Sequence, residues 1–134
     1  MKKDEYQNQF RLTHIIESID KIQKISSTVG DYDTFLDDWV SQDAVERNIQ
    51  IIGEAVGHLD EDLKNEYQSI NWKEIRGMRH HIIHGYHKVD LKTVWDTMTI
   101  DIPLLKKQVE KMLKNVQSKD NHNDSADQNF GPHT

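Results

Sequence analysis

The chain has 134 residues, of which 35% are hydrophobic and 30% charged, with a formal net charge of −6 at pH 7 and no cysteine. This length fits one domain with a single helical core, the lack of cysteine excludes disulfides and thiolate metal sites, and the acidic balance argues against a protein that coats nucleic acid. Because no apolar run approaches the roughly 18 residues of a membrane span and the N-terminus lacks a signal-peptide core, we expect a cytoplasmic protein that does not engage membranes.

Apolar residues recur at spacings of three and four from about residue 6 to residue 28, which predicts a first amphipathic helix. They are Leu12, Ile15, Ile16, Ile19, Ile22 and Ile25. Gly30 is placed to end this helix, and Asp33 to begin a short helical turn over residues 34–40. Three apolar residues of this turn are expected to cover one end of the core: Phe35, Leu36 and Trp39.

A second long helix is expected to begin at Ser41 or Asp43 and to continue to about Leu59, where a polar connection leads to Ile70. Its apolar stripe comprises Val45, Ile49, Ile52, Val56 and Leu59. Asn71 is suited to cap a third helix, which we expect to stop near Gly85.

Asp90 caps the last predicted helix, whose apolar positions continue to about Val116. Pro103 lies inside this run and is expected to kink the helix without ending it. The chain is therefore predicted to be all-α, an up-and-down bundle of four main helices plus a short helix over residues 1–116. The polar segment 117–134 is predicted to be a disordered tail.

Reactive groups are concentrated in the third helix and just beyond it. Residues 72–90 carry four basic and two acidic side chains and form the one net-positive segment, and four of the eight histidines fall between residues 80 and 87. Four residues separate Arg79 from His84, and one residue separates His84 from Tyr86. Arginine can hold a phosphate with two parallel hydrogen bonds, while histidine exchanges protons near neutral pH, so the pair suits phosphodiester chemistry.

With this motif and its flanks, the chain resembles the HepT-like toxins of the HEPN superfamily, over roughly residues 8–116. The motif matches the family pattern Arg-x4-His-x-Tyr, and further matches lie at 42–48, 51–55, 72–79, 89–91 and 94–97. The position after Arg79 is often Asn or Asp in the superfamily and is His80 in this chain. His80 is a supporting residue, and whether it orients the phosphate, the arginine or neither stays open.

The resemblance implies the toxin of a type VII toxin–antitoxin system, a metal-independent endoribonuclease with Arg79 and His84 as catalytic residues. RNA supplies its own 2′-OH nucleophile, and the expected products carry a 2′,3′-cyclic phosphate and a 5′-OH. Five residues correspond to about 140° around a regular helix, so Arg79 and His84 face one site only if the helix bends or ends, or if a second subunit contributes. The resemblance implies the second subunit: a homodimer that pairs around the motif helices.

The resemblance also implies a partner, an MntA-like nucleotidyltransferase antitoxin that transfers AMP to Tyr86, and a larger hetero-oligomer with it. AMP adds bulk and negative charge where RNA phosphate must bind. Glu54 is a candidate to orient Arg79.

Plainer interpretations exist. Arg79 and His84 could serve only in a surface salt bridge and as a cap at the C-terminal end of the helix. Tyr86 could close the helix end against the core. His80 and His84 have zinc-ligand spacing, but no third ligand is evident, so we expect no metal and no cofactor. The alternative function is a catalytically silent HEPN module that scaffolds a nucleotidyltransferase.

Overall fold

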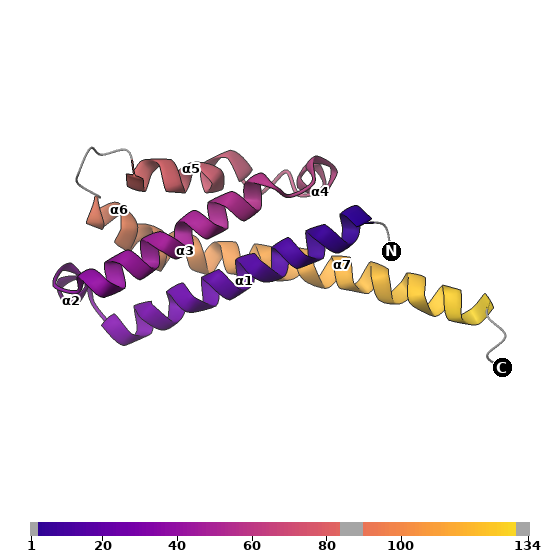
Figure 1. Cartoon of the computed structure of the whole chain (residues 1–134), viewed down its shortest axis with the longest axis horizontal. Coiled ribbons are helices and arrows are strands. Elements are labelled where there is room, and N and C mark those ends of the chain that lie inside the picture. Colours follow the sequence, from indigo (N-terminus) through magenta and orange to yellow (C-terminus); the bar gives the residue numbers. More distant parts are fainter. Residues whose placement is uncertain (1–2, 84–89, 131–134) are drawn as a thin grey trace.

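Two long antiparallel helices, α1 (Lys3–Val29) and α3 (Trp39–Gly57), form the centre of the molecule (Figure 1). In this computed structural model, the backbone is described at residues 3–83 and 90–130 and the side chains at residues 6–78 and 90–118. All regular structure within these ranges is helical, which confirms the predicted all-α class. Across the same ranges, no helix is both long and apolar enough to cross a membrane.

α1 packs against α3 on one side and against α7 (Ile102–Phe130) on another. The predicted apolar stripes of these helices face one another and form the core. Its fully buried members include Leu12, Ile15, Ile19, Ile22, Val45, Ile49, Ile52, Ile102, Val109 and Met112. Burial of such side chains contributes roughly 1.5–3 kcal/mol each. The core therefore lies where the predicted three-and-four spacing places it.

The first turn of the chain is formed as the sequence predicts. α1 ends at Val29, and Gly30 follows with a φ of 82°, a left-handed conformation that glycine adopts without steric cost. The Gly30 amide donates to the Ser26 carbonyl at 3.0 Å. This turn directs the chain back toward α3.

The short helix α2 (Tyr32–Leu36) differs from the expected turn over residues 34–40. Asp38 caps α3 by accepting from the Ser41 amide at 3.1 Å, so Trp39 already belongs to the first turn of α3. Phe35 is buried as predicted, but Leu36 is 40% exposed and Trp39 is 70% exposed. The expectation that all three cover the core was wrong for these two, because the helix boundary turns them away from it.

A short helix, α4 (Glu61–Glu66), interrupts the connection that was expected to be merely polar. Leu63 and Ile70 are buried and attach this connection to the core. α5 (Trp72–Ile83) follows, and the Asn71 side chain accepts from the Glu74 amide at 3.0 Å, as predicted for its cap. α5 lies along α3.

The last predicted helix consists of three pieces: α6 (Leu91–Asp96), the π-helical segment η1 (Thr97–Asp101) and α7. Pro103 lies in the first turn of α7, directly after the π-helical segment. Proline cannot donate a backbone hydrogen bond, and a wider turn accommodates its ring. The helical path thus continues past Pro103, as predicted, and its irregular segment precedes the proline, while the expected kink stays a prediction.

α7 continues as a helix to Phe130, where a disordered tail was expected from residue 117 onward. The chain has no glycine or proline between Pro103 and Gly131, so nothing in its backbone chemistry ends the helix earlier. Packing against the core includes Met112, Leu113 and Val116. The placement of residues 117–134 outside the folded domain stays a prediction.

Candidate functional site

The motif residues are carried by α5 and by the segment that follows it. α5 is held to the bundle by Met78, which is buried, and by Trp72 and Ile75, which pack against the core. Arg79 and His80 lie within the helical backbone of α5, but their side chains are outside the described residues. His84 and Tyr86 fall in the segment 84–89, which is also outside the described residues. The structure therefore describes the backbone of the first motif residues, Arg79 and His80. The arrangement of Arg79, His84 and Tyr86 in a catalytic site stays a prediction.

Arg76 is an exposed cation on α5 for which the sequence alone predicted no role. It lies three residues before Arg79, one turn earlier on α5, and residues at this spacing are neighbours on a helix surface. A Cβ built on Gly57 would lie 3.6 Å from Nε of Arg76 and 3.9 Å from its Cζ. The guanidinium group of Arg76 therefore lies against the last turn of α3, at ordinary van der Waals distance. The signal in the sequence was the pairing of Arg76 with Arg79 at a spacing of three.

The C-terminal end of α3 favours a cation at this position. The last carbonyl groups of a helix lack intrahelical partners and carry partial negative charge. α3 ends at Gly57, and Arg76 forms no ion pair with any acidic side chain among the described residues. Arg76 and Lys73 are both exposed on α5 and give this helix a positive surface on an otherwise acidic protein.

Glu54 lies on α3 one turn before Gly57 and is exposed. This part of α3 lies next to Arg76 of α5, one turn before Arg79, the residue that Glu54 was predicted to orient. The contact itself would involve a side chain outside the described residues, so this role stays a prediction.

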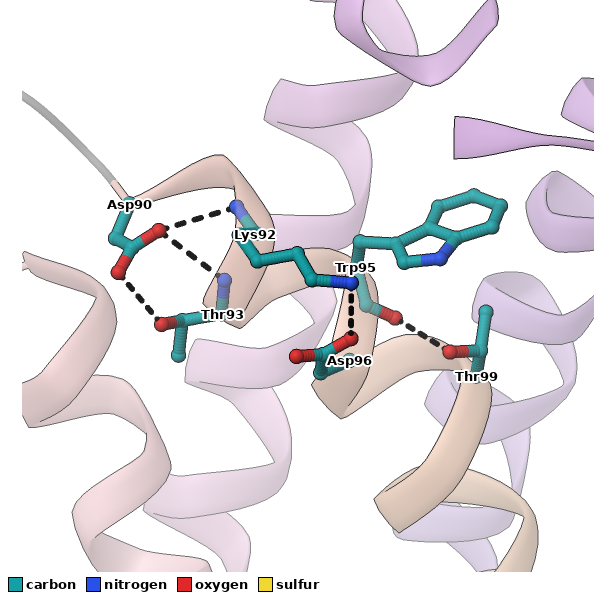
Figure 2. Close-up of polar contacts among 6 residues, drawn as sticks. All are labelled: Asp90, Lys92, Thr93, Trp95, Asp96 and Thr99. Atoms are coloured by element: carbon teal, nitrogen blue, oxygen red, sulfur yellow. Dashed lines mark hydrogen bonds and ion pairs between the residues drawn. The ribbon is translucent and has the colours of Figure 1, made fainter. Parts of the chain in front are cut away.

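On the far side of the segment 84–89, Asp90 fixes the start of α6 (Figure 2). Its Oδ1 accepts from the backbone amides of Lys92 at 3.1 Å and Thr93 at 3.2 Å, and its Oδ2 accepts from the Thr93 hydroxyl at 2.8 Å. These hydrogen bonds, chiefly those from Thr93, hold the pKa of the Asp90 carboxyl below its ordinary value. The carboxylate therefore stays ionised and capping at neutral pH.

Three further contacts join residues at this end of the molecule, two of which are drawn in Figure 2. Lys92 pairs with Asp96 at 3.1 Å along α6, and the Thr99 hydroxyl donates to the Trp95 carbonyl at 2.8 Å. Trp95 also contacts Phe35, with ring centroids 5.5 Å apart, which joins α6 to α2. The chain thus re-enters a well-fixed helix directly after the motif.

A groove of about 190 Å³ lies between α5 and the start of α7. Its lining combines the carboxylates Glu74 and Asp101 with apolar side chains such as Met78 and Leu104. Partial burial, followed by the charges of Glu74 and Asp96, raises the pKa of Asp101. A groove with this charge repels phosphate groups.

The zinc alternative depends on His80 and His84, neither of which has a described side chain. Among the side chains that are described, no three His, Asp or Glu residues are grouped as a metal site would require. The expectation that the protein needs no metal therefore stays a prediction.

Comparison with known proteins gives one family. The family described as "Ribonuclease HepT-like" matches residues 15–112. A Methanocaldococcus jannaschii protein named "Putative RNase MJ1216" is 38% identical over 109 residues, which cover 81% of this chain and 89% of that protein. "Probable ribonuclease HepT" of Thermococcus cleftensis is 38% identical over 103 residues, covering 77% of this chain and 93% of that protein. No solved structure matches the chain significantly.

Proposed function

Because the chain belongs to the HepT-like ribonuclease family of the HEPN superfamily, we propose that it is a metal-independent endoribonuclease and the toxin of a type VII toxin–antitoxin pair. The observation that carries the proposal is the motif Arg79-x4-His84-x-Tyr86 at the end of α5, within the part of the chain that matches the family.

The proposed reaction uses the 2′-OH of RNA as the nucleophile. One His84 acts as the base that takes the 2′-OH proton while the 2′-oxygen forms a bond to phosphorus. The bond from phosphorus to the 5′-oxygen breaks, and an acid delivers a proton to that oxygen. Arg79 stabilises the negative charge of the pentavalent phosphorane. The products are a 2′,3′-cyclic phosphate and a 5′-OH.

The cleft is proposed to be formed by two copies of the chain. Arg79 and His84 are about 140° apart on a regular helix, so a single regular helix does not direct both residues to one site. Two α5 helices paired about a two-fold axis can place Arg79 and His84 of both chains in one cleft. Arg76 extends the positive surface of each α5 by one turn. We assign it to RNA phosphate binding, where it contributes affinity and not proton transfer.

Regulation is proposed to act at Tyr86. An MntA-like nucleotidyltransferase antitoxin transfers AMP from ATP to the phenol oxygen, which releases pyrophosphate. The added phosphate brings negative charge next to the cleft and repels RNA. The affinity for RNA, and with it the activity, falls.

Expression of wild type and of His84→Ala in a bacterial host tests the proposed activity. The wild type is expected to arrest growth and degrade RNA, whereas His84→Ala does neither and keeps the same helical content and oligomeric state. Growth arrest by His84→Ala would reject proton transfer by this residue. Harmless expression of both chains would favour the second candidate, a silent module that scaffolds the nucleotidyltransferase, for which the acidic body of the chain is the supporting observation.

Co-expression with the nucleotidyltransferase tests the regulation separately. The peptide that contains Tyr86 is expected to gain the mass of one or more AMP units, and Tyr86→Phe to prevent the gain. An unchanged peptide mass in the wild type would reject modification at this site.

A further inference from the structure

The corner between α2 and α3 exposes three neighbouring apolar side chains. Leu36 is 40% exposed, Trp39 70% and Val40 59%. Tryptophan is usually well covered in a folded chain, and clustered apolar exposure is typical of an interaction surface. We call these three residues, with the aspartates of segment 31–43, the corner patch.

The corner patch is strongly acidic. Segment 31–43 contains five aspartates and neither lysine nor arginine. Asp31 and Asp38 accept hydrogen bonds from Thr34 and Ser41, which lower the pKa of both carboxyls. The five aspartates flank the exposed apolar residues along the chain, and we call them the negative rim of the corner patch.

The backbone of the corner patch is fixed before any partner arrives. The Gln42 side-chain amide donates to the carbonyls of Phe35 at 2.8 Å and Leu36 at 3.1 Å. The Asp38 amide also donates to the Phe35 carbonyl at 3.2 Å. A preformed surface loses little conformational entropy on binding, so its apolar residues contribute more of their burial energy to affinity.

The corner patch lies at the end of the bundle where α6 begins (Figure 1). Tyr32 of α2 packs on Trp95 with ring centroids 5.7 Å apart, and Nζ of Lys92 lies 5.1 Å from the Tyr32 ring centroid. Lys92 is two residues after Asp90, which directly follows the segment that contains Tyr86. A protein seated on the corner patch is therefore next to the helix that starts just after the tyrosine.

Charge decides which occupant fits. RNA is excluded because five carboxylates repel its phosphates, although an exposed tryptophan could otherwise stack on a base. A second copy related by a two-fold axis would bring ten carboxylates together, which opposes isologous pairing through this surface. A protein with lysine or arginine side chains around an apolar pocket complements both the rim and the centre.

We propose that the corner patch is the docking surface for the nucleotidyltransferase partner, which receives Trp39 in an apolar pocket and pairs basic side chains with the aspartate rim. This inference rests on the proposed function, because it locates the partner that modifies Tyr86. It adds the surface by which that partner reaches the tyrosine.

Affinity measurements between the full-length chain and the purified nucleotidyltransferase test the inference. Trp39→Ala is expected to weaken binding by about tenfold or more, as loss of a central aromatic anchor does. Asp33→Asn combined with Asp37→Asn should weaken binding and reduce its salt sensitivity. The matched control is Phe10→Ala, because Phe10 is 64% exposed on α1, outside the corner patch, and its loss should change the affinity less than about twofold.

Two accompanying measurements separate docking from other effects. RNA cleavage by unmodified Trp39→Ala should equal that of the wild type, and its circular dichroism should show the same fold. Equal affinity for the wild type, Trp39→Ala and the aspartate variant overturns the docking surface and leaves the proposed function intact. If the wild type does not bind the nucleotidyltransferase, both the partner assigned in the proposed function and this docking surface are rejected. Loss of self-association in Trp39→Ala, with partner affinity unchanged, would assign the corner patch to contacts between copies and also overturn the inference.

Discussion

At the scale of single residues, Arg76 of α5 lies beside Gly57, the last residue of α3. Its guanidinium group is at van der Waals distance from a Cβ built at position 57. A cation there is favoured by the carbonyl end of the helix and still has its surface open to a ligand. The same arginine therefore has a local electrostatic role and a proposed role in RNA binding.

Replacing Arg76 with glutamine separates these two roles. If Arg76 binds a phosphate, KM for RNA rises roughly three- to tenfold with little change in kcat, and the slope of log affinity against log salt falls by about one. The control, Lys24→Gln, removes the same charge from an exposed position on α1. A purely structural role is indicated if Arg76→Gln lowers the melting temperature but changes KM no more than the control does.

At the scale of elements, caps and turns fix where each helix begins. The roles of Gly30, Asn71 and Asp90 could be predicted from the sequence. Glycine tolerates the left-handed backbone of a turn, and asparagine and aspartate side chains accept hydrogen bonds from the first amides of a helix. The boundary between α2 and α3 could not be predicted in the same way. Asp31, Asp33, Asp37, Asp38, Ser41 and Asp43 are all chemically competent caps. The structure uses Asp31 for α2 and Asp38 for α3, with Phe35 between them buried in the core.

A pair of glycine substitutions tests this account of the turns. Gly30→Ala should lower the free energy of unfolding by about 1 kcal/mol, because alanine is strained at a φ of 82° although no atom lies within 4 Å of its Cβ. Gly77→Ala, inside α5 with equally open space, should raise it by about 0.5–1 kcal/mol. Chemical denaturation measures both, and a stabilising Gly30→Ala would contradict the assigned turn.

The cap of α6 gives a pH-dependent prediction. The folded-state pKa of Asp90 is lowered, so its stabilising contribution is fully present above the unfolded pKa and is lost as the pH falls through the folded value, below about pH 4. Asp90→Ala should lower the melting temperature by roughly 2–5 °C at pH 7, and the difference should shrink toward pH 3. Asp90→Asn, which still accepts hydrogen bonds but does not titrate, is the control. A difference that is constant with pH would show that the carboxylate charge is not involved.

At the scale of the whole molecule, the bundle could be predicted because each long helix carries one continuous apolar stripe. The site could be predicted only in part. Arg79, His84 and Tyr86 stand out by residue type and spacing, whereas Arg76 is placed by the packing of α5 on α3, beside Gly57, 19 residues earlier in the chain. Exposure of Trp39 was also unpredictable, because a tryptophan beside a buried phenylalanine is ordinarily assigned to the core.

Removal of residues 119–134 tests the predicted domain boundary. Apolar packing of α7 includes Val116, and Gln117 and Ser118 are exposed. The shortened chain should melt within about 2 °C of the full chain, since no buried contact of the described residues is lost. A large fall in the melting temperature would place the C-terminal segment inside the folded domain.

Mixing two inactive variants tests the proposed two-chain cleft. Arg79→Ala and His84→Ala are each expected to be inactive alone. Their mixed dimer retains one wild-type residue of each kind, contributed by different chains, and should recover part of the activity if one cleft uses both. Complete inactivity of a verified mixed dimer would indicate that the cleft needs all four residues or that each chain works alone.

The most direct test of the central claim is cleavage of RNA by the purified protein in EDTA, with His84→Ala in parallel and intact mass recorded to confirm that Tyr86 is unmodified. We predict that the wild type alone cuts RNA and leaves 2′,3′-cyclic phosphate and 5′-OH ends. Unmodified wild type that leaves RNA intact, or cleavage that His84→Ala performs equally well, would contradict the claim that this motif is a metal-independent ribonuclease site.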